Sequence, residues 1–421
     1  MGNASPIYAL QKALAVTRTP ALLDSVVEIY IGKDKAFYGG AQIIYKTPYL
    51  LFPAITTLVK AIPAMQKLHT IHLTRMVASR TGLYSILSSP YLIHLILDRV
   101  QIPKLLDKLP PPKLCQLTLT TMSSWEGVEP LISHLAPSLE YLELQRCEFR
   151  ALGTLLCPPF SRLRELRHHQ SYIRNTVPHP SRLSELFHLG SQITHLHLSG
   201  PFHHTRVTAF PKSLRHLSVE AWVLTEQNFR ASPLHGLLSL TIERCGPGEG
   251  LWRLDDPLTL LPALIRDCFP GIISLQLHIK WSLRNIALVI ARFQRNVQKL
   301  KLVIETTPGL DYHEERDLGC LLHQEDISTA YFCGSTLPAP LQSLSLDVIQ
   351  TRNELEWSVA PCITWVNNDT LPSVTGLGGP DLKSIDASFI RPESKLVPGR
   401  ILRMQWAQST NGDWEMGKCL E

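Results

Sequence analysis

Histidine is the residue type in this chain with the widest chemistry, because an imidazole can bind a metal ion or exchange a proton near neutral pH. Nine of the 17 histidines lie between His168 and His216. His195 and His197 are two residues apart, which places them on one face of a β-strand, and His216 could lie on the next strand. Three imidazoles could then hold a zinc ion. No cysteine or carboxylate is fixed to them by spacing, so we expect no metal ion and no other cofactor, with the three-imidazole site as the alternative.

The nine cysteines show no metal or redox pattern. No two of them lie within four residues of each other, so the C-x-x-C pairs of zinc ribbons and disulfide oxidoreductases are missing from the sequence. An odd number of widely spaced cysteines is typical of reduced thiols. We therefore expect an intracellular protein, in the cytoplasm or the nucleus.

Two stretches resemble short catalytic or cofactor-binding motifs, but each lacks a residue that its motif requires. The glycine-rich stretch from Gly246 to Gly250 has Leu251 where a dinucleotide-binding loop needs its third glycine. His313 is not followed by the second histidine of a zinc-protease helix. The sequence also contains no nucleophile elbow, phosphate-binding loop or kinase series. These observations predict a protein that is not an enzyme.

Charge and hydropathy argue against two kinds of partner. The net charge is +5, without a run of lysine and arginine dense enough to bind nucleic acid. The most apolar window, residues 43–65, is interrupted by lysines and prolines and is therefore no membrane span. We expect neither nucleic acid nor a membrane as a partner.

The elements that must position the polar side chains are repeated along the chain. Leu139 to Cys147 reads LEYLELQRC, an L-x-x-L-x-L pattern followed three residues later by cysteine, which is typical of the strand of a leucine-rich repeat. Thirteen segments fit this frame, and 37 of their 39 inward positions are Leu, Ile or Val; His168 and Ala387 are the exceptions. The segments begin at Val26, Leu68, Leu92, Leu114, Leu139, Leu163, Ile193, Leu214, Leu237, Ile272, Val297, Leu341 and Leu382.

Between these strands the apolar residues take a helical period. Val128, Leu131, Ile132 and Leu135 share one helical face, and similar faces occur within residues 52–62 and 286–293. Strands alternating with short helices predict an α/β fold. We expect a leucine-rich repeat solenoid of about 13 irregular repeats, with a curved parallel sheet on the concave side and short helices on the convex side.

The spacing of the strands also predicts how the chain is divided. The three parts are an N-terminal helical lead-in at residues 1–25, with a helix around Tyr8 to Val16, the solenoid at residues 26–397, and a C-terminal cap or tail at residues 398–421. Three longer steps between strands predict loop insertions near residues 245–256, 305–340 and 361–380.

The functional surface should lie on the polar face of the strands. Side chains alternate along a strand, so the residues between the inward aliphatics must point outward on the concave side. A polar face can simply be solvated, but extended concave surfaces are what solenoids use for binding, and tyrosine and arginine are frequent anchors at interfaces. We therefore expect a partner-binding surface made of Tyr141, Glu143, Glu165, Arg167, His195, His197, His216, Lys299 and Lys301.

The repeats, written as LEYLELQRC, LLSLTIERC, SLRHLSVEA and LQSLSLDVI, resemble the leucine-rich repeat region of F-box proteins, especially the divergent fungal families. The opening, Leu10 to Ile31, resembles the segment that leads from the F-box into the first repeat. This resemblance covers nearly the whole chain and implies a substrate receptor of an SCF-type ubiquitin ligase. The sequence departs from the family because none of the 25 residues before the first predicted strand reads as the L-P-x-E-like start of an F-box, which puts binding to the cullin adaptor in question.

Two functions remain at this point. The first is a non-catalytic module that recognises a protein substrate on its concave face, as in F-box receptors. The alternative is a free-standing inhibitor or scaffold of the ribonuclease-inhibitor type, with no link to ubiquitin.

Overall fold

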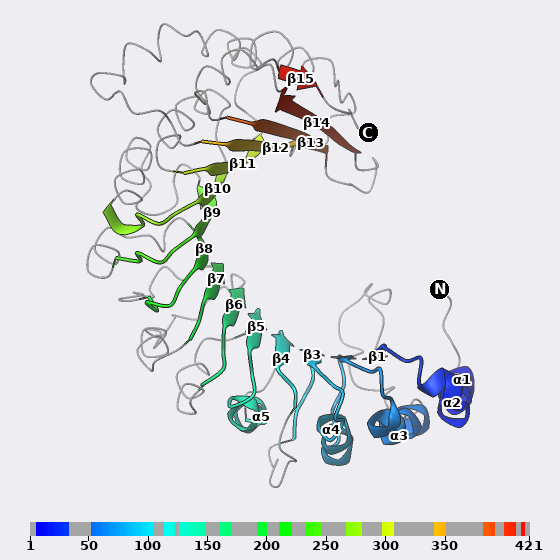
Figure 1. Ribbon diagram of the computed structural model, residues 1–421. Coiled ribbons are helices and arrows are strands. Elements are labelled where there is room, and N and C mark those ends of the chain that lie inside the picture. The colour runs from blue at the N-terminus through cyan, green and yellow to red at the C-terminus, as the bar shows by residue number, and fades with distance from the viewer. Residues whose placement is uncertain are drawn as a thin grey trace, which may run out of the picture. The chain divides into compact units, whose positions relative to one another are not determined.

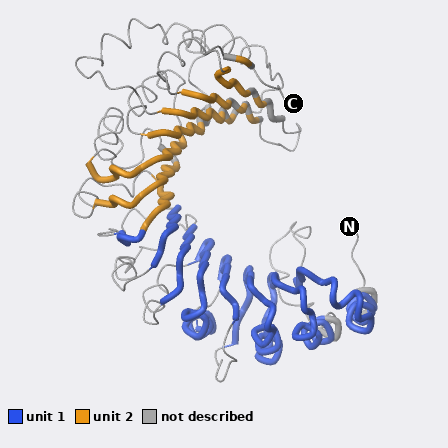
Figure 2. The backbone as a smooth tube through the Cα atoms, in the orientation of Figure 1, with its two compact units in different colours: residues 1–213 blue, residues 214–421 orange. Residues whose placement is uncertain are grey.

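The structure is a computed structural model of the 421-residue chain. It describes residues 6–32, 52–103, 113–122, 126–147, 160–169, 192–199, 210–220, 233–245, 267–279, 297–306, 341–350, 382–391, 400–409 and 414–416. The chain forms two compact units, residues 1–213 and residues 214–421, which Figure 2 shows in different colours.

Unit 1 is built on parallel strands that pair in chain order (Figure 1). The strands are β1 (Glu28–Gly32), β2 (Thr70–Thr74), β3 (His94–Asp98), β4 (Gln116–Thr120), β5 (Tyr141–Gln145), β6 (Glu165–His169) and β7 (His195–Ser199). The helices are α1 (Pro6–Arg18), α2 (Pro20–Leu23), α3 (Phe52–Ala61) with a following 3-10 turn (Ile62–Ala64), α4 (Arg80–Leu87) and α5 (Val128–Leu135). The sheet is mostly parallel with few helices, which is consistent with the predicted α/β repeat solenoid.

The strands form where the sequence alternates aliphatic and polar residues. On β5, Leu142 and Leu144 are 1% and 0% exposed, whereas Tyr141, Glu143 and Gln145 are half-buried. Each aliphatic lies beside its counterpart on the next strand, as Leu117 of β4 lies beside Leu142 of β5. The inward positions of the thirteen predicted segments are buried wherever the structure describes their side chains, except for the half-exposed Val26. The predicted frame is therefore confirmed at these positions.

A left-handed turn ends four successive strands of unit 1. Arg75, Arg99, Thr121 and Arg146 have φ angles of 54°, 55°, 49° and 53°. Each of these residues donates its backbone N–H to a carbonyl at the end of the next strand, at 2.6 to 2.9 Å. The turn therefore sends the chain out of the sheet without leaving this N–H unsatisfied.

Cys147 follows the last of these turns and is buried. Its Sγ lies 3.4 and 3.3 Å from the backbone carbonyl oxygens of Leu119 and Gln145, which share its single proton. Burial raises its pKa to about 11, so the thiol stays protonated near neutral pH and acts as a packed donor rather than a nucleophile.

The helices of unit 1 cover one side of its strands (Figure 1). The helices predicted around Tyr8 to Val16 and from the apolar face of residues 128–135 are present as α1 and α5, and all four apolar residues of that face are buried. The helix α4 was not predicted. It begins after Ser79, whose side chain accepts a hydrogen bond from the N–H of Gly82 at 3.0 Å, and it buries Leu83, Ile86 and Leu87.

Unit 2 continues the same kind of parallel pairing and ends differently. Its strands are β8 (His216–Glu220), β9 (Ser239–Cys245), β10 (Ser274–Ile279), β11 (Lys299–Thr306), β12 (Ser343–Gln350), β13 (Ser384–Arg391), β14 (Arg400–Gln408) and β15 (Trp414–Met416). The strands β8 to β13 pair in parallel, whereas β14 pairs antiparallel with β13 and β15 antiparallel with β14. Trp406 of β14 lies beside Ile385 of β13 and is 3% exposed, so the expected tail contributes a buried residue to the sheet.

Some boundaries of the predicted insertions are corrected by these strands. Cys245 belongs to β9, and Glu305 and Thr306 belong to β11, because the strands of unit 2 run further than the repeat frame requires. The rest of the three predicted insertions, and the helix predicted within residues 286–293, lie outside the described residues.

Candidate partner-binding surface

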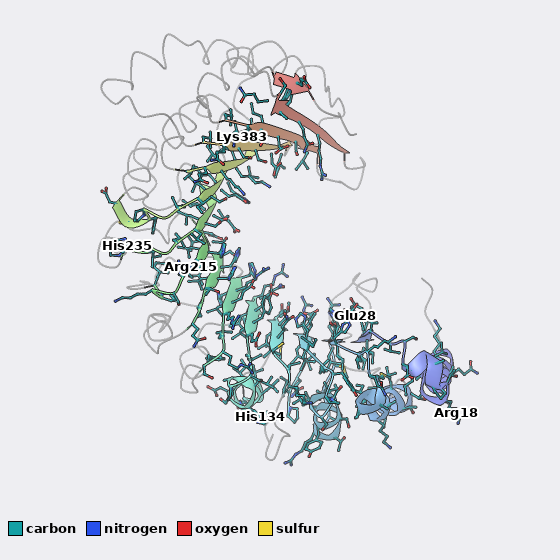
Figure 3. All side chains as sticks on the ribbon, viewed as in Figure 1. Arg18, Glu28, His134, Arg215, His235 and Lys383 are labelled. Carbon is teal, nitrogen blue, oxygen red and sulfur yellow. The ribbon has the colours of Figure 1, made fainter. Side chains whose placement is uncertain are left out.

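The outward-pointing side chains of the strands of unit 1, most of them polar, lie on the side of the sheet that the helices leave uncovered. Figure 3 shows Glu28 of β1 on this side and His134 of α5 on the other. We call this surface, formed by the outward-pointing residues of β1 to β7, the open face. The strand register arranges it in three rows across the strands. The rows are Glu28, Thr70, His94, Gln116, Tyr141, Glu165 and His195; then Tyr30, His72, Ile96, Thr118, Glu143, Arg167 and His197; then Gly32, Thr74, Asp98, Thr120, Gln145, His169 and Ser199.

Glu143 lies at the centre of the densest contacts on the open face, and its side chain is 13% exposed. Its Oε2 accepts hydrogen bonds from the hydroxyl of Tyr141 at 2.7 Å and from that of Thr118 at 3.3 Å. Its Oε1 accepts a hydrogen bond from Nε2 of Gln145 at 2.7 Å and lies 3.6 Å from Nε2 of His169. Residues from three neighbouring strands therefore hold this carboxylate in one position.

These contacts set the charge of Glu143. Partial burial by itself would raise the pKa of this carboxyl, but the hydrogen bonds from Gln145 and Tyr141, the proximity of His169 and the bond from Thr118 lower it by more. The pKa of Glu143 is therefore below its ordinary value, and the group is a carboxylate throughout the neutral range. Burial and the bond to Glu143 raise the pKa of the Tyr141 hydroxyl, which stays protonated and keeps donating.

Arg167 lies beside this centre and is half-exposed. Its Nε donates to Oε1 of Glu165 at 2.7 Å, and its guanidinium carbon lies 5.6 Å from the centroid of the Tyr141 ring. Desolvation would lower the pKa of the guanidinium, but the bond to Glu165 and the nearby Tyr141 raise it by more. The cation is thus held between an aromatic ring and a carboxylate. It gains a cation–π interaction from the ring and a charge-assisted hydrogen bond from the carboxylate.

His94 extends the network toward β3. Its Nε2 lies 3.0 Å from Oγ1 of Thr118, and since Thr118 donates its only hydroxyl proton to Glu143, His94 must be the donor. Its ring also meets Tyr141 edge to face, with centroids 6.1 Å apart. Burial and the proximity of His72 lower the pKa of His94, so the imidazole is neutral near pH 7. Thr118 belongs to the open face, but its neighbours bury it to 5% exposure.

Two histidines continue the surface on β6 and β7. The rings of His169 and His197 lie 4.4 Å apart, and Nδ1 of His169 lies 2.7 Å from Oγ of Ser199. His195 is exposed, and its Nδ1 lies 2.9 Å from Oγ1 of Thr194. His168 points to the opposite side of the sheet from His169 and is fully buried among the aliphatic residues.

A separate cluster lies at the β1 edge of the open face and consists of Glu28, Tyr30 and His72. Nε2 of His72 lies 2.6 Å from Oε1 of Glu28. The rings of Tyr30 and His72 stack, with centroids 4.1 Å apart and an angle of 18° between their planes. Tyr30 is nevertheless 70% exposed, more than any other large hydrophobic side chain that the structure describes as exposed.

The predicted site residues fall into two groups. Tyr141, Glu143, Glu165 and Arg167 lie together, and His197 and His195 follow on the next strand. The remaining predicted residues, His216, Lys299 and Lys301, belong to unit 2. There Nζ of Lys301 lies 2.7 Å from Oδ2 of Asp347.

The sequence pattern missed Gln145 and His169 because both lie beyond the last aliphatic of the L-x-x-L-x-L frame. The strands of unit 1 have a third outward position, and extending the alternation by two residues would have found both. For the three-imidazole site, the described residues contain no group of three or more His, Cys, Asp or Glu side chains placed to hold a metal ion. They also contain no helix that is long and apolar enough to cross a membrane.

Comparison with known proteins identifies no family. No family model matches the chain, and no curated protein matches its sequence. One solved structure with a match is that of a Bacteroides fragilis protein, which is 11% identical. The match covers 62% of this chain and 61% of that one, with a TM-score of 0.32. A likeness of this degree supports no inference about fold or function.

Proposed function

We propose that this chain is a leucine-rich repeat protein without catalytic activity and that it binds a protein partner on the open face of unit 1. The proposal rests on the open face, where side chains are held in place by one another and still remain partly exposed. Its tyrosine, glutamate and arginine side chains on β5 and β6 are held by one another and by Thr118 of β4, while Arg167 and Glu165 keep 48% and 28% of their side chains exposed. Side chains that are ordered before binding lose less conformational entropy when a partner docks.

The repeat class is supported by three features. The L-x-x-L-x-L aliphatics are buried, a left-handed turn follows four of the strands, and the thiol of Cys147 lies within hydrogen-bond distance of two backbone carbonyls at the position where this repeat class has asparagine or cysteine. An asparagine at that position would use its side-chain amide as the cysteine uses its thiol. We propose about 13 repeats, one for each segment that fits the frame.

The two roles predicted from the sequence are both compatible with this function. The resemblance to F-box proteins favours recognition of a substrate for a ubiquitin ligase, and the alternative is an inhibitor or scaffold of the ribonuclease-inhibitor type. The free thiols of Cys115 and Cys147 fit an intracellular protein of either role. A pull-down of the purified cullin adaptor separates the roles: adaptor retained as by an F-box control supports the first, and no retention supports the second.

The binding surface is tested by capturing partners from native cell extract with the full chain and with single variants. Arg167→Ala removes an exposed anchor, and its loss should reduce partner affinity about tenfold. Arg80→Ala is the matched control, because Arg80 is an exposed arginine on α4, on the helix side of unit 1. Partners retained equally by the wild type and Arg167→Ala would contradict the proposal, as would partners lost equally with both variants.

A further inference from the structure

The charge of the open face is opposite to that of the whole chain. Its acidic residues are Glu28, Asp98, Glu143 and Glu165, and its only lysine or arginine is Arg167. Four carboxylates and one guanidinium give these strand residues a formal charge of −3 with neutral histidines, whereas the chain carries +5. Arg99, which follows β3, lies 3.9 Å from Asp98 and offsets one of the four carboxylates. A surface of this sign attracts cations and repels nucleic acid and acidic peptides.

The open face already holds one cation, which shows how it would bind another. The guanidinium of Arg167 lies between the ring of Tyr141, 5.6 Å from its centroid, and the carboxylate of Glu165, 2.7 Å from Nε. An aromatic face and a carboxylate are therefore enough on this surface to position an arginine.

The cluster of Glu28, Tyr30 and His72 offers the same two groups to a cation from outside. One face of the Tyr30 ring is stacked on His72, which fixes the ring, and Tyr30 is 70% exposed. The carboxylate of Glu28 is held by His72 and keeps 40% of its side chain exposed.

We propose that the partner docks through a basic peptide segment and that one lysine or arginine of this segment binds between the Tyr30 ring and Glu28. This inference rests on the proposed function and adds the chemistry of the partner to it. The segment docks at the β1 edge of the open face, so that Arg167 on β6 is left to contact another part of the partner. A cation on Tyr30 gains from the ring quadrupole and from the carboxylate together.

The experiment measures binding of a short fluorescent peptide of alternating glycine and arginine to the full chain by fluorescence anisotropy. Peptides with glutamine or glutamate in place of arginine serve as probes of charge. Glu28→Gln removes the charge and keeps the shape of the side chain, and Tyr30→Leu removes the aromatic ring. The matched controls are Glu129→Gln on α5 and Tyr84→Leu on α4, since Glu129 and Tyr84 lie on the helix side and Tyr84 is 47% exposed.

We expect the arginine peptide to bind and the glutamine and glutamate peptides to bind at least tenfold more weakly. Glu28→Gln and Tyr30→Leu should each weaken the arginine peptide roughly 2- to 5-fold. The two control variants should leave its affinity unchanged. Raising the salt from about 50 mM to about 500 mM should weaken binding further, because the charges are exposed.

Equal affinity for the arginine and glutamine peptides would overturn the inference, as would equal losses in Glu28→Gln and Glu129→Gln. The proposed function fails separately, when Arg167→Ala leaves the capture of partners unchanged. If capture depends on Arg167 while Glu28→Gln and Tyr30→Leu change neither capture nor peptide affinity, the binding surface stands and the basic segment is wrong.

Discussion

Glu143 and Arg167 point to the same side of neighbouring strands, yet their truncation should have different effects. Glu143 accepts hydrogen bonds from Tyr141, Gln145 and Thr118 and is 13% exposed, so Glu143→Ala leaves half-buried donors without their acceptor. We expect a loss of about 1–3 kcal/mol in the free energy of unfolding. Arg167→Ala breaks an exposed ion pair and should cost less than about 1 kcal/mol.

Chemical denaturation of the two variants beside the wild type checks this difference. A Glu143→Ala protein as stable as Arg167→Ala would mean that the hydrogen-bond network of Glu143 contributes nothing to folding. The distinction could not be drawn from the sequence, because alternation places both residues on one face and says nothing about which one its neighbours cover.

His168 occupies an inward position of the aliphatic ladder, between Leu144 and Leu198 on the neighbouring strands. Burial, and to a smaller extent the proximity of His169, lower its pKa to about 3. An unfolded chain binds a proton at this histidine near pH 6.5, whereas the folded chain does not until about pH 3. The stability associated with His168 is therefore complete above pH 6.5 and falls as the pH drops toward 3.

At pH 5 this linkage should reduce the free energy of unfolding by about 2 kcal/mol relative to pH 7. His168→Leu fits the ladder and removes the titrating group, so the variant should lose less stability over the same range. Urea denaturation at pH 7, 6 and 5 measures both slopes. Glu143 also titrates, but its lowered pKa confines its contribution to more acidic solution, which separates the two groups. Identical slopes for the wild type and His168→Leu would show that His168 is charged in the folded chain.

The strand is the element that the sequence predicted best. Aliphatic side chains must avoid water, so a frame of Leu, Ile and Val defines which side of each strand is buried. The helices were harder to predict. Both α4 and α5 are eight residues long, but α5 buries four apolar residues at helical spacing, whereas α4 buries three, Leu83, Ile86 and Leu87, and was missed. Short helices depend on packing and caps such as Ser79 more than on their own pattern.

Leu142→Ala tests the ladder at its centre. Leu142 is 1% exposed and lies between Leu117 and Leu166 on the adjacent strands, so the variant leaves a cavity. We expect a loss of about 2–5 kcal/mol in the free energy of unfolding. Ile93→Ala is the matched control, because Ile93 is an aliphatic residue beside a strand and is 44% exposed, and its loss should stay below about 1 kcal/mol. Equal losses in the two variants would mean that the strand register is wrong.

At the scale of the whole molecule, the sequence predicted the order of the strands but not the network on the open face. Order follows from the repeat, because each strand can cover the apolar edge of the one before it. The contacts among Tyr141, Glu143 and Arg167 depend on side-chain rotamers on two neighbouring strands, which no spacing in one strand specifies. The stacked Tyr30 was missed for the same reason, since its partner His72 is 42 residues away along the chain and only the register of β1 and β2 brings them together.

Local pairing also predicts which strands are destabilised by a substitution in the aliphatic ladder. Each strand within a unit pairs only with its neighbours, so a defect should weaken the adjacent strands most and distant ones little. Hydrogen exchange of Leu142→Ala should therefore show faster exchange in β4, β5 and β6, and unchanged exchange in β12. Leu344→Ala, at the equivalent inward position of β12, should give the reverse, with faster exchange in β11, β12 and β13 and none of the change in β5. A uniform increase across all strands in either variant would show that the chain unfolds as one cooperative body, in which case local pairing would not govern its stability.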